Sequence, residues 1–272
     1  MSLRPAADAV SAEKTENEER QQGPGPQLKT GWVGAETAHS PSQCAVHVQS
    51  GFDWTAADAY LFDIDGTLLN SRDTVHYFAF HRAVEKIFGL DFRIDGVPVH
   101  GNTDVGILRA YLELAQIPES EWRPRLPEVI ELMSSDVEFG AAELRPELCP
   151  AILEIIEDLS SRGKLLGVAS GNLERVGWAK LRASGLRNYF SFGAFSGQLE
   201  KRDDVIAHGI AQARELLGKG AVVYVVGDTP ADIHSAHNND VPAIAVATGI
   251  YSVEELLLHK PEMCISCFND VL

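Results

Sequence analysis

The sequence predicts an α/β fold, in which a parallel sheet carries helices on both faces and an α-helical cap is inserted. Strand-like and helix-like segments alternate with short turns over the C-terminal half of the chain, which is typical of a parallel sheet flanked by helices. The strand segments are almost continuously apolar, as in 221–226, and such strands are covered on both faces. Residues 73–145 instead show helical periodicity and little strand character. The core is therefore expected to be Rossmann-like, with the insertion as a separate cap domain.

Hydrophobic periodicity places the elements in order along the chain. Apolar runs predict strands over 59–63, 165–169, about 191–195, 222–226, 243–247 and 263–265. Helical periodicity predicts helices between the later strands, over 150–162, 173–184, 203–217, 230–238 and 252–258. Within the insertion, the candidate helices are Val75–Phe88, Asp104–Gln116 and Pro127–Phe139. Glycine and proline residues interrupt the pattern between these last three.

The same pattern divides the chain into three parts. Residues 1–55 form an expected disordered N-terminal extension, because this stretch is rich in small and polar residues and buries too little apolar area to become ordered. The core domain is expected over 56–72 and 146–272, and the cap domain over 73–145. Ligands of such sheets bind outside the carboxyl ends of the strands, so a helical block inserted after the first strand is expected to act there as a lid.

Charge and hydropathy narrow the possible partners. The formal charge of −16 argues against a nucleic-acid partner, because phosphate backbones attract basic surfaces. No apolar stretch approaches the roughly 20 residues that span a bilayer, so we expect no membrane partner. The N-terminal stretch lacks the features of a signal or transit peptide, and we expect a cytoplasmic monomer or homodimer. Because an acidic surface repels anionic substrates, a phosphate site in this chain needs local cations.

The most informative segment follows the first strand, where Asp63 and Asp65 stand one residue apart, before Gly66 and Thr67. Side chains at positions i and i+2 of a strand share a face, so both carboxylates are expected to project the same way. Carboxylates this close repel each other, which requires either a bound proton or a cation between them. A calcium loop would need a Glu at its twelfth position, which is Thr74 in this chain. An ordinary turn remains the alternative at this point.

A second polar cluster follows the strand at 165–169. Ser170, Gly171 and Asn172 offer a hydroxyl, an amide and backbone N–H groups at a strand-to-helix turn. Such groups could grip phosphate oxygens, with the N-terminus of the next helix adding positive potential. A helix N-cap formed by Ser170 or Asn172 is the alternative.

A third cluster follows the strand at 222–226. Asp228 directly ends this buried strand, where an uncompensated carboxylate is costly, and a cation shared with Asp63 and Asp65 would remove that cost. Magnesium, held by a few carboxylates, water and phosphate, suits such a site better than zinc. Asp232 falls in the first turn of the next helix and could equally be a cap. Lys201 is the best-placed candidate for a fixed cation, although charged residues before helices are usually solvated.

Taken together and in this order, these motifs resemble the four motifs of the haloacid-dehalogenase-like (HAD) hydrolase superfamily. The motifs are Asp63-Ile-Asp65-Gly66-Thr67, Ser170, Lys201 and Gly227-Asp228-x-x-x-Asp232. The insertion is similar to the helical cap of subfamily I, and the chain looks phosphoglycolate-phosphatase-like. One position departs from the pattern, because family members commonly have Lys-Pro at the third motif, whereas Lys201 is followed by Arg202. Either Lys201 or Arg202 could therefore fill the cationic role.

The resemblance implies a reaction as well as a fold. Asp63 would be the nucleophile that forms an aspartyl-phosphate, and Asp65 the acid that protonates the leaving oxygen and then activates water. Dehalogenases of the superfamily lack an acid two residues after the nucleophile, so Asp65 favours phosphoryl transfer. The implied function is a magnesium-dependent phosphatase acting on a small phosphorylated metabolite, phosphoglycolate-like or a sugar phosphate. A phosphomutase of the β-phosphoglucomutase type is the alternative, and a non-catalytic phosphate-binding module is a weaker one.

The resemblance also implies which residues bind the metal and the substrate. Ser170 and Lys201 would neutralise the transferring oxygens. The Mg²⁺ ligands would be Asp63, the backbone carbonyl of Asp65, and Asp228, with Asp232 supporting Lys201 or the waters of the metal. Substrate contacts would come from Thr67, Gly171 and Asn172 in the core and from Asn102, Thr103 and Arg109 in the cap. For Gly101 to Asp104, a helix N-cap is an equally weighted alternative.

Overall fold

The structure is a computed structural model, and it describes residues 46–272. The strands of its main sheet are β1 (Val46–Val48), β2 (Ala59–Phe62), β5 (Leu165–Leu173), β6 (Phe192–Ser196), β7 (Val223–Gly227), β8 (Ala243–Val246) and β9 (Met263–Ile265). These seven strands lie in the order β1-β9-β8-β7-β2-β5-β6. All neighbours pair in parallel except β1, which runs antiparallel to β9.

The register of the central strands determines which residues meet at the carboxyl edge. Strand β2 lies between β5 and β7, and its last residue, Phe62, pairs with Val168 on one side and Val226 on the other. The residues that follow Phe62, Val168 and Val226 therefore lie next to one another at this edge. Strand β5 continues to Leu173, so Ser170, Gly171 and Asn172 lie in the strand and not in the strand-to-helix turn that the sequence predicted. This edge contains the three polar clusters that the sequence predicts.

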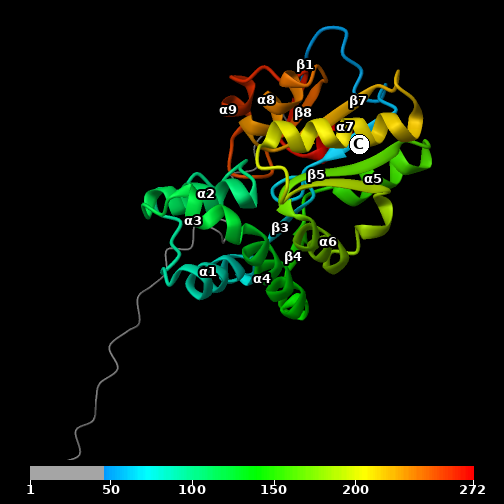
Figure 1. Ribbon diagram of the computed structural model, residues 1–272. Coiled ribbons are helices and arrows are strands. Elements are labelled where there is room, and N and C mark those ends of the chain that lie inside the picture. Colours follow the sequence, from blue (N-terminus) through cyan, green and yellow to red (C-terminus); the bar gives the residue numbers. More distant parts are fainter. Residues whose placement is uncertain (1–45) are drawn as a thin grey trace, which may run out of the picture. The chain divides into compact units, whose positions relative to one another are not determined.

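Helices cover both faces of the sheet. One face packs against α5 (Ile152–Ser161) and α6 (Glu174–Ala183), and the other against α7 (Arg202–Leu217), α8 (Pro230–Asn238) and α9 (Val253–Leu257). Alternate residues of β2 face opposite cores, as the two-residue period of a strand requires: Phe62 packs with Ile156 of α5, and Leu61 with Ile206 of α7. Figure 1 shows α7 (yellow) lying along the strands of the sheet.

The insertion folds as a helical block with its own apolar core. Its helices are α1 (Val75–Phe88), α2 (Asp104–Leu114), α3 (Glu119–Trp122) and α4 (Leu126–Phe139). The centre of this core is formed by fully buried large side chains, among them Phe80, Phe92, Leu112, Trp122 and Met133. Leu173, the last residue of β5, joins the same core together with Val176 and Ala179 of α6. Short 3₁₀ turns complete the described chain at Arg123–Arg125, Ala141–Glu143, Arg187–Tyr189 and Phe268–Val271.

A two-stranded antiparallel ribbon, which the sequence did not predict, connects this block to the core. It consists of β3 (Leu69–Ser71) and β4 (Pro146–Leu148), the segments through which the chain enters and leaves the insertion. A hydrogen bond from the Arg72 amide to the Arg145 carbonyl, 2.9 Å long, extends the pairing by one step. Both connections of the cap are thus held side by side.

The N-terminal boundary needs a correction. We expected a disordered extension over 1–55, but 46–48 form β1, whose backbone pairs with β9. Partners far away in the sequence supply these hydrogen bonds, so local composition gives no sign of the strand. Residues 1–45 lie outside the described residues, and for them the extension stays a prediction. Among 46–272, no helix combines the length and the apolar character needed to cross a bilayer.

Candidate active site

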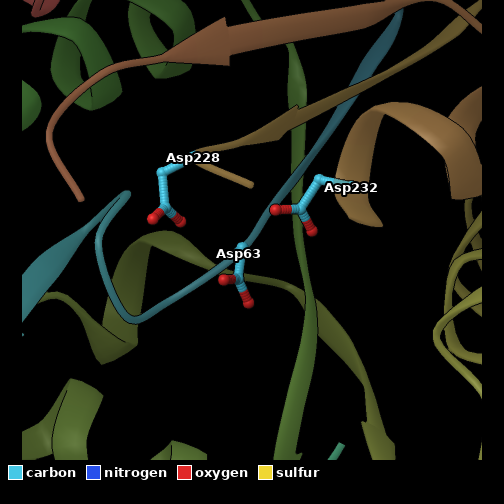
Figure 2. Close-up of side chains that lie close together, drawn as sticks. All are labelled: Asp63, Asp228 and Asp232. Carbon is cyan, nitrogen blue, oxygen red and sulfur yellow. The ribbon is translucent and has the colours of Figure 1, made fainter. Parts of the chain in front are cut away.

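Three buried carboxylates meet at the carboxyl edge of the sheet. Asp63 follows β2, Asp228 follows β7, and Asp232 lies in the first turn of α8. One oxygen of each lies within 4.8 Å of the other two, and Figure 2 shows the three side chains close together. Of the carboxylates predicted for the site, these three form a group that could hold a metal ion.

The loop after β2 is shaped to fit against Asp228. Gly66 has φ +87°, and a Cβ at this position would lie 2.2 Å from Asp228 Oδ2, so only glycine allows the approach. The hydroxyl of Thr67 donates to Asp228 Oδ1 over 3.1 Å, and Thr67 is fully buried. Thr67, predicted as a substrate contact, is placed here as a support for Asp228.

Asp232 uses both of its oxygens within the protein. Oδ2 accepts hydrogen bonds from the amide (3.1 Å) and the hydroxyl (2.7 Å) of Thr229. The amide bond, together with the bond from the Asp232 amide to the Thr229 hydroxyl, forms a capping box at the start of α8. Oδ1 accepts from Arg202 Nε over 3.0 Å and from Arg202 Nη2. Asp232 is therefore arranged to hold Arg202, with little capacity left to bind a metal directly.

The structure brings Arg202, and not Lys201, into the site. Arg202 is buried at the first position of α7, and its Nη2 lies 2.8 Å from Asp63 Oδ1. Lys201, the residue before the helix, is exposed. The planar guanidinium can contact two carboxylates at once, which the ammonium of a lysine does poorly.

The electrostatics of the carboxylates favour a bound cation. Burial raises the pKa of Asp63 to about 6, although the charge of Arg202 opposes the shift. Burial and the charges of Asp232 and Asp63 raise the pKa of Asp228 well above its ordinary value. Among the described residues, Asp63 Oδ1 is also a buried acceptor without a well-aligned hydrogen bond. A hard divalent cation between Asp63 and Asp228 would satisfy these oxygens, and Mg²⁺ fits such a donor set.

Asp65 faces a different set of partners. Its carboxylate receives hydrogen bonds from Lys180 Nζ, at 2.9 and 2.7 Å, and from Asn172 Nδ2, at 2.8 Å. Burial opposes ionisation, but the charge and hydrogen bonds of Lys180, with that of Asn172, outweigh it and lower the pKa of Asp65. Asn172 Nδ2 also donates to Ser170 Oγ over 2.8 Å. Ser170, Asn172 and Asp65 thus form one hydrogen-bonded group.

A segment of the cap closes against this group. A Cβ on Gly171 would lie 2.3 Å from the carbonyl oxygen of Asn102, so glycine is needed for the cap to approach the end of β5. Asn102 and Thr103 serve the start of α2: the Asn102 side chain accepts from the Thr103 amide, and Thr103 caps the helix. Thr103 is therefore the N-cap of α2, and the Asn102 side chain is bonded to the amide of that residue.

The cap is tied to the core through two carboxylates. Asp104 Oδ2 accepts a hydrogen bond of 2.7 Å from the Leu173 amide of β5. On the core side, the carboxylate of Glu200 pairs with two arginines of the cap. Its Oε2 lies 3.2 Å from Arg123 Nη2 and 3.6 Å from Arg109 Nη1. The Thr103 hydroxyl donates to the Glu200 carbonyl over 2.5 Å. Arg109, predicted as a substrate contact, is placed in this junction.

A family model for haloacid dehalogenase-like hydrolases matches residues 60–246, which is more than half of the chain. The chain belongs to this family. Comparison with curated relatives agrees with the assignment. A phosphoglycolate phosphatase from Synechococcus elongatus is 27% identical over 79% of this chain and 95% of its own length. A phosphorylated carbohydrates phosphatase from Thermotoga maritima is 24% identical over 79% of this chain and 100% of its own length.

The fold agrees with the same family. The solved structure of a haloacid dehalogenase-like hydrolase from Bacteroides fragilis matches with a TM-score of 0.61 and 20% identity, covering 79% of this chain and 100% of that one. The fold class and the family predicted from the motifs are confirmed, and a phosphoric monoester hydrolase, the predicted enzyme class, agrees with the names of the relatives.

Two features of this HAD-like site escaped the sequence prediction. Lys180 was not singled out, although its position carries a signal: Val176, Ala179 and Lys180 share the buried face of α6, and a lysine within an apolar stripe needs a partner. Glu200 gives no such signal, because its partners, Arg123 and Arg109, belong to the cap and lie 77 and 91 residues away in the sequence.

Proposed function

We propose that this chain is a magnesium-dependent phosphatase that hydrolyses a small phosphorylated metabolite through an aspartyl-phosphate on Asp63. The observation that carries the proposal is the pairing of Asp63 and Asp228, two buried carboxylates with raised pKa values whose oxygens face each other at the ends of adjacent strands. The family assignment and the names of the relatives support phosphoryl transfer as the reaction.

In the first step, an oxygen of Asp63 attacks phosphorus, a new O–P bond forms and the ester O–P bond breaks. Asp65 gives a proton to the leaving oxygen, so that an alcohol departs. In the second step, Asp65 takes a proton from a water molecule that attacks the aspartyl-phosphate, which releases phosphate and restores Asp63. Covalent catalysis of this kind divides one difficult displacement into two easier ones.

Positive charge and hydrogen-bond donors then stabilise the transferring oxygens. Ser170 Oγ accepts from Asn172, which leaves its own hydrogen to donate to phosphate. We assign the cationic role to Arg202, because it lies against Asp63, whereas Lys201 is exposed. Asp63, the backbone carbonyl of Asp65 and Asp228 would hold Mg²⁺, which supplies charge neutralisation. Asp232 would act by holding Arg202.

The cap would select the substrate and exclude water from the site. Asn102 and its neighbours approach Gly171 and Glu200 at the edge of the site, so a bound substrate would meet this segment of the cap. The expected substrates are phosphoglycolate-like compounds or sugar phosphates. A cytoplasmic location and a monomer or homodimer belong to the same proposal.

The test is a panel of phosphate esters incubated with the purified full chain, in MgCl₂ or in EDTA. Phosphoglycolate, several sugar phosphates and p-nitrophenyl phosphate form the panel, and released phosphate is measured. The proposal expects Mg²⁺-dependent release from at least one alkyl phosphate. Interconversion of β-glucose 1-phosphate and glucose 6-phosphate without net release would instead favour the phosphomutase. Absence of both reactions would contradict an enzyme and favour a phosphate-binding module.

A further inference from the structure

Lys180 is a buried lysine whose ammonium faces Asp65. It lies on the inner face of α6, and its side chain is only 3% exposed. Nζ lies 2.9 and 2.7 Å from the two oxygens of Asp65 and 2.9 Å from Asn172 Oδ1. A buried ammonium is costly unless it is paired, and these three contacts pair it.

The hydrogen bonds of the ammonium all go to two residues. Its acceptors are the two carboxylate oxygens of Asp65 and the side-chain oxygen of Asn172. Lys180 is therefore arranged to act on Asp65 rather than on the substrate.

Asn172 completes the support on the same side of Asp65. Its Nδ2 donates to Asp65 Oδ2 over 2.8 Å, while its Oδ1 accepts from Lys180. Asp65 itself keeps 41% of its side chain exposed. The carboxylate is thus hydrogen-bonded to Lys180 of α6 and Asn172 of β5 and is still partly exposed.

The two buried cations near the site serve different carboxylates. Arg202 lies against Asp63 and Asp232, whereas Lys180 lies against Asp65. Lys180 comes from the helix after Ser170, far in the sequence from the Lys201–Arg202 motif. Its contacts therefore add a second fixed cation, distinct from the one at that motif.

We propose that Lys180 is a positioning residue, which fixes the carboxylate of Asp65 for proton transfer to and from the reacting oxygens and acts only through Asp65. This role rests on the proposed phosphatase function. A catalytic group has to be held within a fraction of an ångström of its working position. When the residue that holds it is removed, the rate of the reaction can fall about a hundredfold.

A double-mutant cycle tests the dependence on Asp65. Lys180→Met, Asp65→Asn and the double variant are compared in kcat and KM, with the alkyl phosphate that the wild-type chain hydrolyses fastest. Lys180→Met is expected to lower kcat about 10- to 100-fold with little change in KM. In the Asp65→Asn background the same substitution should have almost no effect, because its target is absent. Effects that multiply would overturn the proposal.

The leaving group supplies a second readout that a purely structural role would not change. p-Nitrophenolate leaves without protonation, whereas an alkoxide does not, so kcat/KM for phosphoryl transfer should fall less with p-nitrophenyl phosphate. Equal losses in kcat/KM on both esters would contradict a role through Asp65. Lys180→Arg, which keeps the charge, should recover part of the loss, and Lys219→Met, at an exposed lysine, should match the wild type.

Folding and metal binding are followed separately. The gain in thermal stability on adding Mg²⁺ should be the same in Lys180→Met and in the wild type, because the expected ligands are unchanged. If Lys180→Met does not fold, Lys180→Gln, which keeps an amide donor, takes its place in the cycle. A wild-type chain without any phosphatase activity would overturn the proposed function, and this role for Lys180 with it. An active wild type with a multiplicative cycle would overturn the positioning role alone.

Discussion

The carboxyl groups of the site differ in what surrounds each one. Asp63 and Asp228 are buried in a low-dielectric environment that raises their pKa values, while Lys180 and Asn172 lower that of Asp65. The first two carboxylates therefore favour a bound cation or proton, whereas Lys180 and Asn172 favour the ionised form of Asp65, which accepts a proton from water in the second step. That proton is the one that Asp65 gives to the leaving oxygen in the next turnover. This contrast agrees with a metal site at Asp63 and Asp228 and a separate acid/base group at Asp65.

Removal of the metal should make stability depend on pH in a defined direction. The pKa of Asp63 is raised in the folded chain from an ordinary 3.8 to about 6, so the metal-free fold binds a proton more tightly than the unfolded chain. In EDTA, the contribution of Asp63 to stability is therefore full below pH 4 and is lost as pH rises through 6. Asp228 acts in the same direction.

Magnesium competes with these protons, so it should stabilise the chain more at pH 7.5 than at pH 5. At a hundredfold excess over the Kd, the gain would be about 2.7 kcal/mol. Thermal unfolding with MgCl₂ and with EDTA at both pH values measures it. Asp228→Asn should lose most of the gain. A gain that is equal at both pH values, or that survives in Asp228→Asn, would contradict the proposed site.

The two neighbouring cations of the third motif should differ sharply in importance. Arg202→Lys keeps a charge but cannot hold Asp232 and contact Asp63 together, so we expect kcat/KM to fall about 10- to 100-fold and the melting temperature to drop. Lys201→Met changes an exposed side chain. It should leave kcat/KM within about twofold of the wild-type value and the melting temperature unchanged. Steady-state kinetics and thermal unfolding measure both variants. A larger loss in Lys201→Met than in Arg202→Lys would assign the cationic role to Lys201 instead.

At the scale of elements, the junction between the cap and the core is concentrated on a few residues. Glu200 receives two arginines and a hydroxyl from the cap, and it stands directly before Lys201 and Arg202. The ribbon of β3 and β4 holds together the two segments through which the chain enters and leaves the cap. Movement of the cap relative to the core would have to break the contacts at Glu200.

Neutralising Glu200 should therefore loosen the cap. In Glu200→Gln, we expect backbone amides at the start of α2 to exchange hydrogen about two- to fivefold faster, measured by mass spectrometry. Glu119→Gln is the matched control, because Glu119 also pairs with Arg123 but lies within the cap. Equal exchange in Glu200→Gln and Glu119→Gln would show that the contact with the core does not hold the cap.

The elements that the sequence predicted are those with a local signal. The strands at the centre of the sheet are almost continuously apolar runs, and the helices on both faces have clear periodicity. Strands β1, β3 and β4 are each three residues long, and β4 begins with Pro146, which argues against a strand. Their hydrogen bonds come from partners far along the chain, so only the folded chain shows them.

At the scale of the whole molecule, the site could be predicted because parallel strands bring their carboxyl ends together. This rule alone places Asp63, Ser170 and Asp228 at one edge of the sheet. It does not give the direction of a side chain, so the choice between Lys201 and Arg202 stayed open in the sequence. Lys180 escaped for the same reason, since its contact with Asp65 crosses 115 residues of sequence.

The central claim is that Asp63 is the nucleophile of a metal-dependent phosphatase. Phosphate release by the wild-type chain and by Asp63→Asn, each in MgCl₂ and in EDTA, tests it most directly. We predict release by the wild type in MgCl₂ alone, and a rate at least about 1,000-fold lower for Asp63→Asn, because an amide cannot form the acyl-phosphate. Release by Asp63→Asn at a rate near that of the wild type would contradict the claim.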